Sequence, residues 1–406
     1  MTAPIAFAEA RAIVDRIARG QPLPSEAVTL SRSHGRVLAA DLVAGIAQPP
    51  FDNAAMDGFA VRFASGDVTG EASRFTLVGE QFAGGPGPDR LAPGTCLRIT
   101  TGAPVPPDAD AVVMKEHVRL QGDVVQVDVL PAPGQFIRRR GVDTAPGDRL
   151  LRAGDMLGPA QVSVAAAQGR AGLDVARRPT VAVFTTGDEL VEPGMPLLHG
   201  QVYNANRELL MGLLRADGLE PVAWPTLPDD PAQVESAFRH AGHAFDVVLT
   251  IGGVSAGEKD FIPSLMHGQG EVHFWKVRMR PGMPVLFAGG GRLGSALFLC
   301  LPGNPVSVLA SYLALGRVLL DGLQGRANAR PVLRARMATG WSKTHERLEF
   351  LRGRLEPGQD GTLWVTPNPA DGSHRIRAAA ESDVLLVLEE RAGDRERGEA
   401  VDVIPY

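Results

Sequence analysis

Apolar and polar residues follow different patterns in successive parts of the chain. In residues 7–19, Ala10, Ile13, Val14 and Ile17 fall on one helical face. Two prolines follow, and Ser25 is placed to cap a second short helix. These segments bury little by themselves, so we expect them to pack against a later part of the chain or a second subunit.

Residues 46–144 instead hold short β-prone runs between glycine and proline turns, which predicts a small β domain. A helical pattern returns in residues 145–178, with Pro159 starting a helix. If residues 145–178 pack with the N-terminal segments, the β domain is an insertion in an elongated unit.

From residue 179 to 327, apolar strand-like runs alternate with amphipathic helical segments. The run at 246–251 is rich in valine and leucine, which is typical of a buried parallel strand. Asn304 and Pro305 suit the N-cap and first position of the last helix. This alternation predicts an α/β sheet with helices on its faces.

The pattern from residue 328 to 406 is β again and predicts a C-terminal barrel. The expected fold is therefore a multidomain α/β plus β protein. Its parts are an elongated N-terminal domain, an inserted β domain, a three-layer αβα domain and a C-terminal β-barrel. Their expected bounds are 1–45 with 145–178, 46–144, 179–327 and 328–406.

Composition narrows the functional classes. The chain has 406 residues, and its net charge of −5 argues against non-specific nucleic-acid binding. Its two cysteines, Cys96 and Cys300, cannot form a disulfide framework, which fits a reducing compartment. The most apolar stretch, 306–320, is too short to span a bilayer, and no signal peptide is evident. We expect a cytoplasmic protein without a membrane segment.

Polar clusters follow the predicted strands of the α/β domain. They are Thr185–Glu189, Asp229–Asp230, Gly252–Asp260 and Pro302–Pro305. Glycine loops and helix N-termini offer N–H groups to phosphate, and paired carboxylates suit Mg²⁺. The cluster pattern favours a phosphorylated or nucleotide-like ligand with a divalent ion. The alternative is a set of ordinary loops with solvated acids. The candidate ligand-binding residues are Gly252, Gly253, Ser255, Pro302, Gly303 and Asn304.

A basic stretch places Lys276, Arg278 and Arg280 on one side of an extended chain, since alternate residues share a face. This row could bind an oxyanion, or it could protect an edge strand against aggregation. Two further segments are unusual for linkers. Residues 49–59 are apolar and distinctive, and residues 138–143 concentrate three arginines beside an acid.

Seven segments together resemble the molybdopterin molybdenumtransferase (MoeA) family, which includes the E domain of gephyrin. They are PPFDNAAMDGFAV (49–61), RITTGAPVPPDADAVVMKE (98–116), FIRRRGVD (136–143), VFTTGDEL (183–190), YNANRELL (203–210), LTIGGVSAGEKDF (249–261) and LPGNPVSVL (301–309). The resemblance covers essentially the whole chain. It implies a homodimer whose active site joins the α/β domain of one subunit to the β domain of the other.

The reaction implied by the resemblance uses adenylated molybdopterin, molybdate and Mg²⁺, and it releases AMP. Contact with the molybdopterin adenylyltransferase is implied as a second partnership. The matching catalytic positions are Asp57, Thr101, Glu189, Asp229, Asp260 and Lys276, with Glu189, Asp229 and Asp260 as metal ligands. The matching substrate-binding positions are Arg138, Asp143, Arg280 and, by weaker local similarity, Ser373.

One segment departs from the family pattern of lysine-proline-glycine-lysine-proline. Here it reads Arg280-Pro-Gly-Met283-Pro, so Met283 removes a cation. This departure keeps two alternatives open, a paralogue with altered anion use and a non-catalytic scaffold or cofactor carrier. Adenylation of molybdopterin is a third, although the β domain and barrel argue against it.

Overall fold

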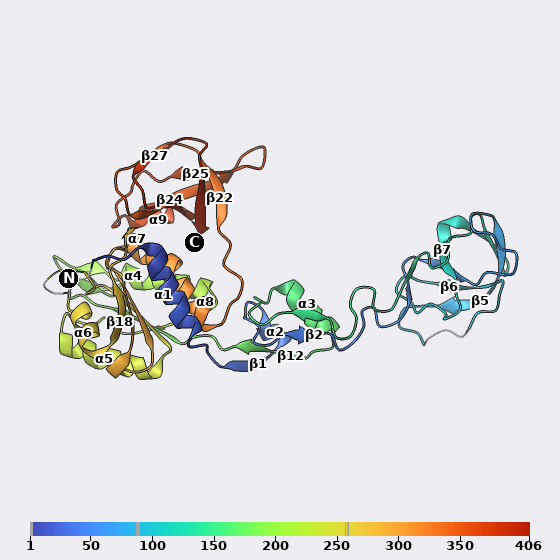
Figure 1. Ribbon diagram of the computed structural model, residues 1–406, viewed down its shortest axis with the longest axis horizontal. Helices are drawn as coiled ribbons and strands as arrows, with labels where there is room; N and C mark the ends of the chain where they lie inside the picture. The colour runs from blue at the N-terminus through green and yellow to red at the C-terminus, as the bar shows by residue number, and fades with distance from the viewer. Residues whose placement is uncertain (1–2, 87–89, 256, 258–259) are drawn as a thin grey trace.

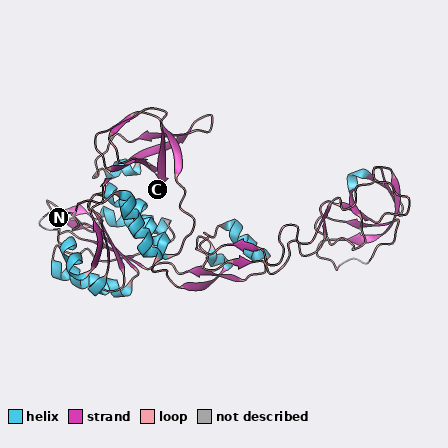
Figure 2. Ribbon diagram, viewed as in Figure 1, coloured by secondary structure: helices cyan, strands magenta, loops and turns pink. Residues whose placement is uncertain are grey.

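The computed structural model describes residues 3–86, 90–255, 257 and 260–406. The chain is elongated (Figure 1). The α/β domain and the C-terminal barrel lie together at one end, a small unit lies in the middle, and the inserted β domain lies at the other end. Figure 2 shows that the inserted domain consists almost entirely of strands and loops. Lys259, which the sequence places at the rim of the glycine loop, lies outside the described residues.

The α/β domain is built on one six-stranded sheet with the order β16-β13-β17-β21-β20-β18. These strands are β16 (Val222–Ala223), β13 (Val181–Thr185), β17 (Val247–Ile251), β21 (Leu297–Leu301), β20 (Leu286–Gly289) and β18 (Glu271–Trp275). The first four run parallel to one another, and β20 and β18 are antiparallel to their neighbours.

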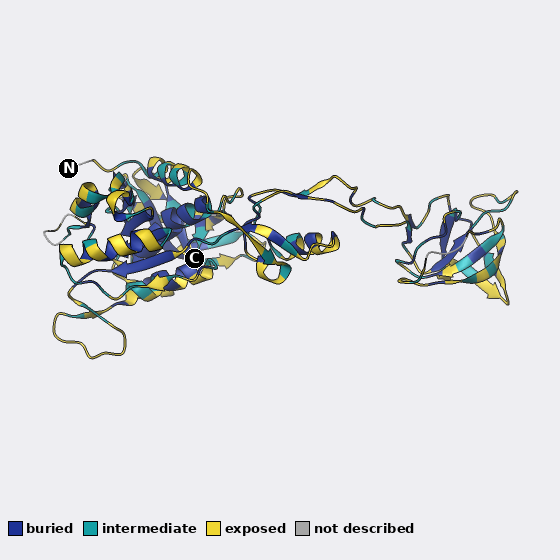
Figure 3. Cartoon of the chain, turned by 90° about the horizontal axis from the view of Figure 1, so that it is seen from below, coloured by how far each residue is buried: buried dark blue, intermediate teal, exposed yellow. Residues whose placement is uncertain are grey.

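Both faces of this sheet are covered, which explains why its central strands are apolar without alternation. Every residue of β13, β17 and β21 is buried (Figure 3). Alternate residues point to opposite faces. Val181 and Val183 join one core with α4 (Ala205–Ala216), whereas Ala182 and Phe184 join another with α5 (Pro231–Ala244) and α6 (Ile262–Gln269). The predicted three-layer domain is confirmed.

The last helical segment of this domain combines α7 (Pro305–Ser311), a π-helical turn η3 (Tyr312–Gly316) and α8 (Arg317–Leu323). At 19 residues it is longer than predicted, and by length and hydropathy alone it could cross a membrane. Its apolar window is 83% buried inside the protein, so the segment is a core helix. It begins after Asn304 as predicted, although the Asn304 side chain makes no cap hydrogen bond.

The first helix, α1 (Phe7–Arg19), packs on α8, which is the first of the two alternatives that the sequence left open, a later part of the chain or a second subunit. Ala10, Val14 and Ala18 are fully buried in the core that also holds α8. A Cβ at Gly322 would lie 2.7 Å from the Ala18 Cβ, so glycine permits this close approach. The N-terminal helix therefore adds a layer to the α/β domain.

The middle unit joins residues far apart in sequence. β1 (Ser25–Thr29) pairs antiparallel with β12 (Gly172–Ala176), and β2 (Leu42–Val43) pairs with β11 (Arg149–Leu151). Two helices, α2 (Leu30–Ser33) and α3 (Pro159–Ala167), complete it. The prediction of a helix directly after Ser25 was wrong. Residues 25–29 form a strand, because they pair with residues 172–176.

The inserted domain has a six-stranded sheet in the order β7-β4-β6-β5-β9-β8, with two small cores. Its strands are β4 (Gly58–Val61), β5 (Ser73–Gln81), β6 (Thr95–Ile99), β7 (Ala111–Met114), β8 (Val118–Gln121) and β9 (Val124–Val127). A separate pair, β3 (Asn53–Ala54) and β10 (Ile137–Arg138), lies where the chain enters and leaves.

The C-terminal domain is a closed barrel, as predicted. Its strands are β22 (Leu333–Met337), β24 (Leu348–Pro357), β25 (Leu363–Pro367), β26 (Val384–Leu388) and β28 (Ala400–Pro405). Pairing of β24 with β26 closes the sheet. A short strand from the α/β domain, β19 (Met279–Arg280), joins parallel to β24 and ties the two domains together.

Candidate functional site

The carboxyl ends of β13, β17 and β21 bring three of the predicted loops together. The Thr186 amide donates to the Ile251 carbonyl at 3.1 Å, and the Gly252 amide donates to the Leu301 carbonyl at 3.0 Å. A Cβ at Gly303 would lie 3.7 Å from the Gly252 Cα. Because these strands are parallel neighbours, their loops form one rim, which is where open α/β sheets bind ligands.

Glycine is required at the start of the central loop. Gly252 and Gly253 have φ angles of 94° and 64°. A Cβ at Gly252 would lie 2.9 Å from the Thr186 carbonyl oxygen, and one at Gly253 would lie 3.0 Å from Ile262. A side chain would therefore both strain the backbone and close the space between the two loops. Ser255 follows in the exposed part of this loop.

Two buried polar atoms at this rim have no hydrogen-bond partner among the residues that the structure describes. They are Thr186 Oγ1, on the turn after β13, and Asn206 Oδ1, at the start of α4. Asn206 also donates from Nδ2 to the Gly303 carbonyl at 2.5 Å, so it joins the first and last loops. Buried polar atoms are normally satisfied, and unpaired ones at a rim suit a polar ligand. Sequence reasoning missed Asn206, although it lies in the quoted YNAN segment.

The acidic residues cluster around the same rim. The Asp229 amide donates to Asp188 Oδ1 at 3.1 Å, which joins the loop before α5 to the turn after β13. Glu189 folds over Gly187, where a Cβ would lie 2.5 Å from Glu189 Oε2. The Gly257 amide donates to Asp260 Oδ2 at 2.9 Å, so Asp260 shapes the end of the glycine loop.

The described residues contain no group of three histidine, cysteine or acidic side chains that could hold a metal by themselves. Glu189, Asp229 and Asp260 nevertheless come from neighbouring loops of one rim. Mg²⁺ is commonly bound by one or two carboxylates, with substrate phosphates and water as the other ligands. The oxygen donors of these three carboxylates therefore fit Mg²⁺ held together with substrate.

Lys276 stands beside this rim, but the predicted basic row is wrong. Trp275 Nε1 donates to the Val254 carbonyl at 3.0 Å, and Lys276 Nζ lies 4.3 Å from the Trp275 ring centroid. Lys276 has a φ of 75°, which ends the extended chain, and residues 279–280 then join the barrel. The left-handed backbone turn and the change of sheet break the alternation on which the row depended.

Arg280 lies where the α/β domain meets the barrel. Its Nη2 is 2.9 Å from Asp371 Oδ2, and its Nη1 is 3.5 Å from Glu349 Oε1. The Ser373 carbonyl accepts from the Val306 amide at 3.1 Å, so the barrel loop that carries Ser373 contacts the beginning of α7. The sequence patterns did not identify Arg352. This buried arginine donates to the carbonyls of Gly372 and Ala370 and so holds the loop that carries Ser373.

The inserted domain carries a second polar cluster. Asp57 Oδ1 accepts hydrogen bonds from the amide and hydroxyl of Thr101, both at 2.8 Å. Lys115, which the sequence did not single out, lies 3.8 Å from Asp57 Oδ2. The hydrogen bond from the Thr101 amide is the largest of the effects that lower the pKa of Asp57. Asp57 is half exposed and stays ionised, so it can face a ligand from outside the domain.

Arg138 and Asp143 lie on the segment through which the chain leaves the inserted domain. Arg138 pairs in β10 with Asn53 of the 49–59 segment. Asp143 is exposed, and its carboxylate accepts from Thr144 Oγ1 at 3.4 Å. Between them, Arg139 is bound to Asp52 at 2.7 Å, which makes that arginine a structural one.

These two clusters are separated within one chain. Among the described residues, no hydrogen bond or ion pair joins residues 49–143 to residues 179–406. The middle unit lies between the two domains (Figure 1). Asp57 and Thr101 therefore form one group, and the strand-end residues with Lys276, Arg280 and Ser373 form another.

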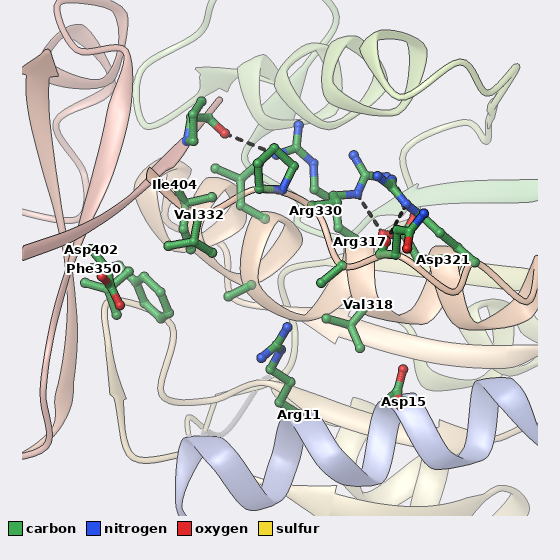
Figure 4. A pocket seen from close by; sticks show the side chains of 18 of the residues that line it. Arg11, Asp15, Arg317, Val318, Asp321, Arg330, Val332, Phe350, Asp402 and Ile404 are labelled. Carbon is green, nitrogen blue, oxygen red and sulfur yellow. Dashed lines mark hydrogen bonds and ion pairs between the residues drawn. The ribbon is translucent and has the colours of Figure 1, made fainter. Parts of the chain in front are cut away.

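A pocket of about 470 Å³ lies elsewhere, between α1, α8 and the barrel (Figure 4). Asp217, at the end of α4, anchors the ion-pair network beside it. Asp217 accepts from Arg317 Nε at 2.9 Å, Arg330 Nη1 at 2.6 Å and Tyr312 Oη at 2.6 Å. None of the predicted site residues lines this pocket. Its ion pairs connect α4, α8 and the segment that leads into the barrel.

Comparisons with known proteins agree with this architecture. Residues 5–169 match the MoeA N-terminal region (domain I and II), residues 182–321 match a probable molybdopterin binding domain, and residues 334–406 match the MoeA C-terminal region (domain IV). The crystal structure of the molybdopterin biosynthesis MoeA protein from Pyrococcus horikoshii is similar over 100% of both chains, with a TM-score of 0.85 and 27% identity.

Curated relatives point the same way. The molybdopterin molybdenumtransferase of Haemophilus influenzae is 37% identical over 388 residues, which cover 95% of each chain. The molybdopterin molybdenumtransferase 2 of Mycobacterium tuberculosis is 38% identical over 374 residues, covering 89% of this chain and 90% of that one. The fold and rim define an α/β molybdopterin-binding class of protein. Within that class, the chain belongs to the MoeA family of molybdopterin molybdenumtransferases, enzymes of molybdenum cofactor biosynthesis.

Proposed function

We propose that this chain acts as a cytoplasmic homodimer that inserts molybdenum from molybdate into adenylated molybdopterin, with Mg²⁺-dependent release of AMP. The observation that carries the proposal is the convergence of four strand-end loops at one rim, two of which carry Gly252 and Gly303 and three of which carry the acids Glu189, Asp229 and Asp260. The separate Asp57 cluster supports a dimer, because it supplies a second group of polar residues that this chain does not bring to its own rim.

The residues of the rim would have separate roles in binding the substrate and the metal ion. The loops at Gly252 and Gly303 offer backbone donors close to the substrate, and Lys276 supplies a cation. Glu189, Asp229 and Asp260 would hold Mg²⁺, which when bound neutralises charge on the pyrophosphate link. Asp57 and Thr101 of the partner copy would close the cleft from the opposite side.

No protein nucleophile is needed for this reaction. Burial raises the pKa of Cys96 and of Cys300 to about 12, so each cysteine stays an unreactive thiol. An oxygen of molybdate or of water would instead attack the phosphorus on the pterin side of the pyrophosphate link, and the bond from that phosphorus to the bridging oxygen would break, so that AMP leaves with this oxygen. The cations of the rim, together with Mg²⁺ when it is bound, would stabilise the charge that develops on the phosphate oxygens.

The source of adenylated molybdopterin would be a molybdopterin adenylyltransferase in contact with this protein. Met283 is the feature that favoured a non-catalytic carrier. Membership of the transferase family along the whole chain favours the enzyme instead. The acids at positions 57, 189, 229 and 260 are also all present.

The test is AMP release from adenylated molybdopterin by purified protein with Mg²⁺, with and without molybdate. We expect molybdate-dependent release that EDTA abolishes and added Mg²⁺ restores. Asp57→Ala and Glu189→Ala should each abolish it while the protein stays dimeric. Asp128→Ala removes an exposed acid and Glu235→Ala a half-buried one, each in an ion pair with a nearby arginine; both serve as matched controls and should stay active. Absence of molybdate-dependent AMP would refute the proposal.

A further inference from the structure

Asn204 is a buried polar residue between two of the acid-bearing loops. It stands directly before α4 and is 1% exposed. Its Oδ1 accepts from the Arg207 amide at 3.4 Å, which caps the helix. Its Nδ2 donates to Thr185 Oγ1 at 2.7 Å and to Thr226 Oγ1 at 3.0 Å. The side-chain oxygen and both N–H groups are therefore engaged within the protein, which fits a supporting role rather than direct contact with a ligand.

The two threonines lead into the loops that carry the acids. Thr185 ends β13, four residues before Glu189, and Thr226 comes three residues before Asp229. The Leu227 amide donates to the Thr185 carbonyl at 2.9 Å, so the backbones of the two loops also meet here. The asparagine therefore connects the two side chains at the point from which both acid-bearing loops leave the sheet.

The segment after Glu189 returns to the same asparagine. The Val202 amide donates to the Glu189 carbonyl at 2.9 Å, and the Asn204 amide donates to the Val191 carbonyl at 2.9 Å. The backbone that carries this acid is thus held on both sides, before the acid by the threonine of β13 and after it by the residues next to Asn204.

An ion pair closes this network toward solvent. Arg207 Nη1 donates to Glu192 Oε1 at 2.6 Å, and Thr226 Oγ1 donates to the same carboxylate oxygen at 3.4 Å. Since Thr226 donates its proton there, the Thr185 hydroxyl, 3.3 Å away, donates to Thr226. The two hydroxyls therefore form one directed chain from Asn204 to Glu192. A chain whose members are all satisfied in this way is rigid, because each hydrogen bond fixes the direction of the next.

We infer that Asn204 is a positioning residue of the proposed metal site, and that it sets the relative placement of Glu189 and Asp229. Carboxylates that hold Mg²⁺ together with substrate need a fixed mutual placement, because Mg²⁺ demands near-octahedral geometry. Groups that orient metal ligands without touching the metal change its affinity by roughly 10–100-fold when they are removed. This inference rests on the proposed transferase function, in which these acids hold Mg²⁺.

The experiment measures metal affinity in Asn204→Ala. Mn²⁺, used as a probe for Mg²⁺, is titrated into the protein with AMP present, and EPR reports the free ion. We expect the Kd for Mn²⁺ to rise roughly tenfold. The Mg²⁺ concentration that gives half-maximal AMP release should rise by a similar factor, whereas the KM for molybdate should stay near that of wild type. Ser33→Ala, which removes a buried hydrogen bond in the middle unit, is the matched control for lost stability and should change neither metal constant.

A second variant separates positioning of the acids from capping of the helix. Thr226→Val removes the hydroxyl that links Asn204 to the Asp229 loop and leaves the cap of α4 in place, so both metal constants should rise, by a smaller factor. Unchanged metal constants in a folded Asn204→Ala protein, or in Thr226→Val if Asn204→Ala does not fold, would overturn the inference. A wild type that binds no Mn²⁺ with AMP would also overturn it. If wild type releases no AMP, the proposed function fails, and the Mn²⁺ titration alone then decides this inference.

Discussion

The two candidate half-sites lie at opposite ends of one chain, so subunit mixing can test whether they combine between copies. Asp57→Ala disables the β-domain half, and Glu189→Ala disables the strand-end half. Each homodimer should be inactive. In a mixed dimer, the intact β domain of the second variant would face the intact rim of the first. One of the two clefts would then be complete, and the other would lack both carboxylates.

The expected activity follows from this geometry. A mixed dimer purified through two different affinity tags should show about half of the wild-type AMP release per dimer, since one of its two symmetric sites is intact. Random exchange of subunits in an equal mixture makes about half of the dimers mixed, so the unpurified mixture should reach about a quarter. AMP is measured at saturating substrates, so that weaker binding does not hide a complete site.

A site built within one chain predicts a different result. Each subunit of the mixed dimer would then carry one disabled half, and no cleft would be complete. AMP release at the background of the single variants, in a mixed dimer shown to be intact by size-exclusion chromatography, would refute the arrangement between subunits. A control dimer of wild type with the double variant must be about half active if the sites are independent and lie within chains, but inactive if they are shared.

Two stability predictions follow from buried structure. Asp217→Ala should lower the free energy of unfolding by about 3–5 kcal/mol, because it leaves the largely buried Arg317 without its acid and the buried Tyr312 hydroxyl without its acceptor, although Arg330 keeps Asp321. The exposed Asp15→Ala should cost less than about 1 kcal/mol in the same urea titration. Burial alone would raise the pKa of Asp217, but hydrogen bonds and nearby cations lower this pKa below 3.8. The contribution of Asp217 to the stability of the folded protein is therefore fully present above pH 3.8, and it is lost as the pH falls through the lowered pKa. Equal costs for Asp217 and Asp15 would contradict the network. Gly252→Ala should cost roughly 1–3 kcal/mol through its positive φ and its contact with Thr186, whereas Gly303→Ala, which meets ordinary contact distances, should be nearly silent in thermal unfolding.

Much of the α/β domain could be predicted because its signals are local. The runs at 181–185 and 247–251 are apolar except for one threonine each, without polar alternation, which requires cover on both faces of a sheet. Parallel strands bring their carboxyl ends to one edge, so the sequence predicts that the loops at Gly252 and Gly303 meet, as they do. The seven quoted segments are runs of consecutive residues, so they identified the family without any information on how side chains pack.

Other features depend on partners distant in sequence, and local patterns do not encode them. Residues 25–29 form a strand because residues 172–176 pair with them, not because of their own propensity. Lys276 has a positive φ and departs from the extended conformation at the point where the chain passes from the α/β sheet to the barrel sheet. Arg352 lies in an ordinary β pattern, yet it supports the loop that carries Ser373.

The sequence by itself determined the order of the domains, the strand-end glycines and acids, and the family to which the chain belongs. These depend on local periodicity and on contiguous motifs, which survive without knowledge of contacts. Only the tertiary structure decided which charges are free. Arg280 is matched by acids from the barrel, whereas Arg347 lies beside Met283 without a carboxylate partner among the described residues. Ion pairing depends on distances of a few ångströms between residues far apart in the sequence, such as Arg280 and Asp371, and no local pattern carries that information.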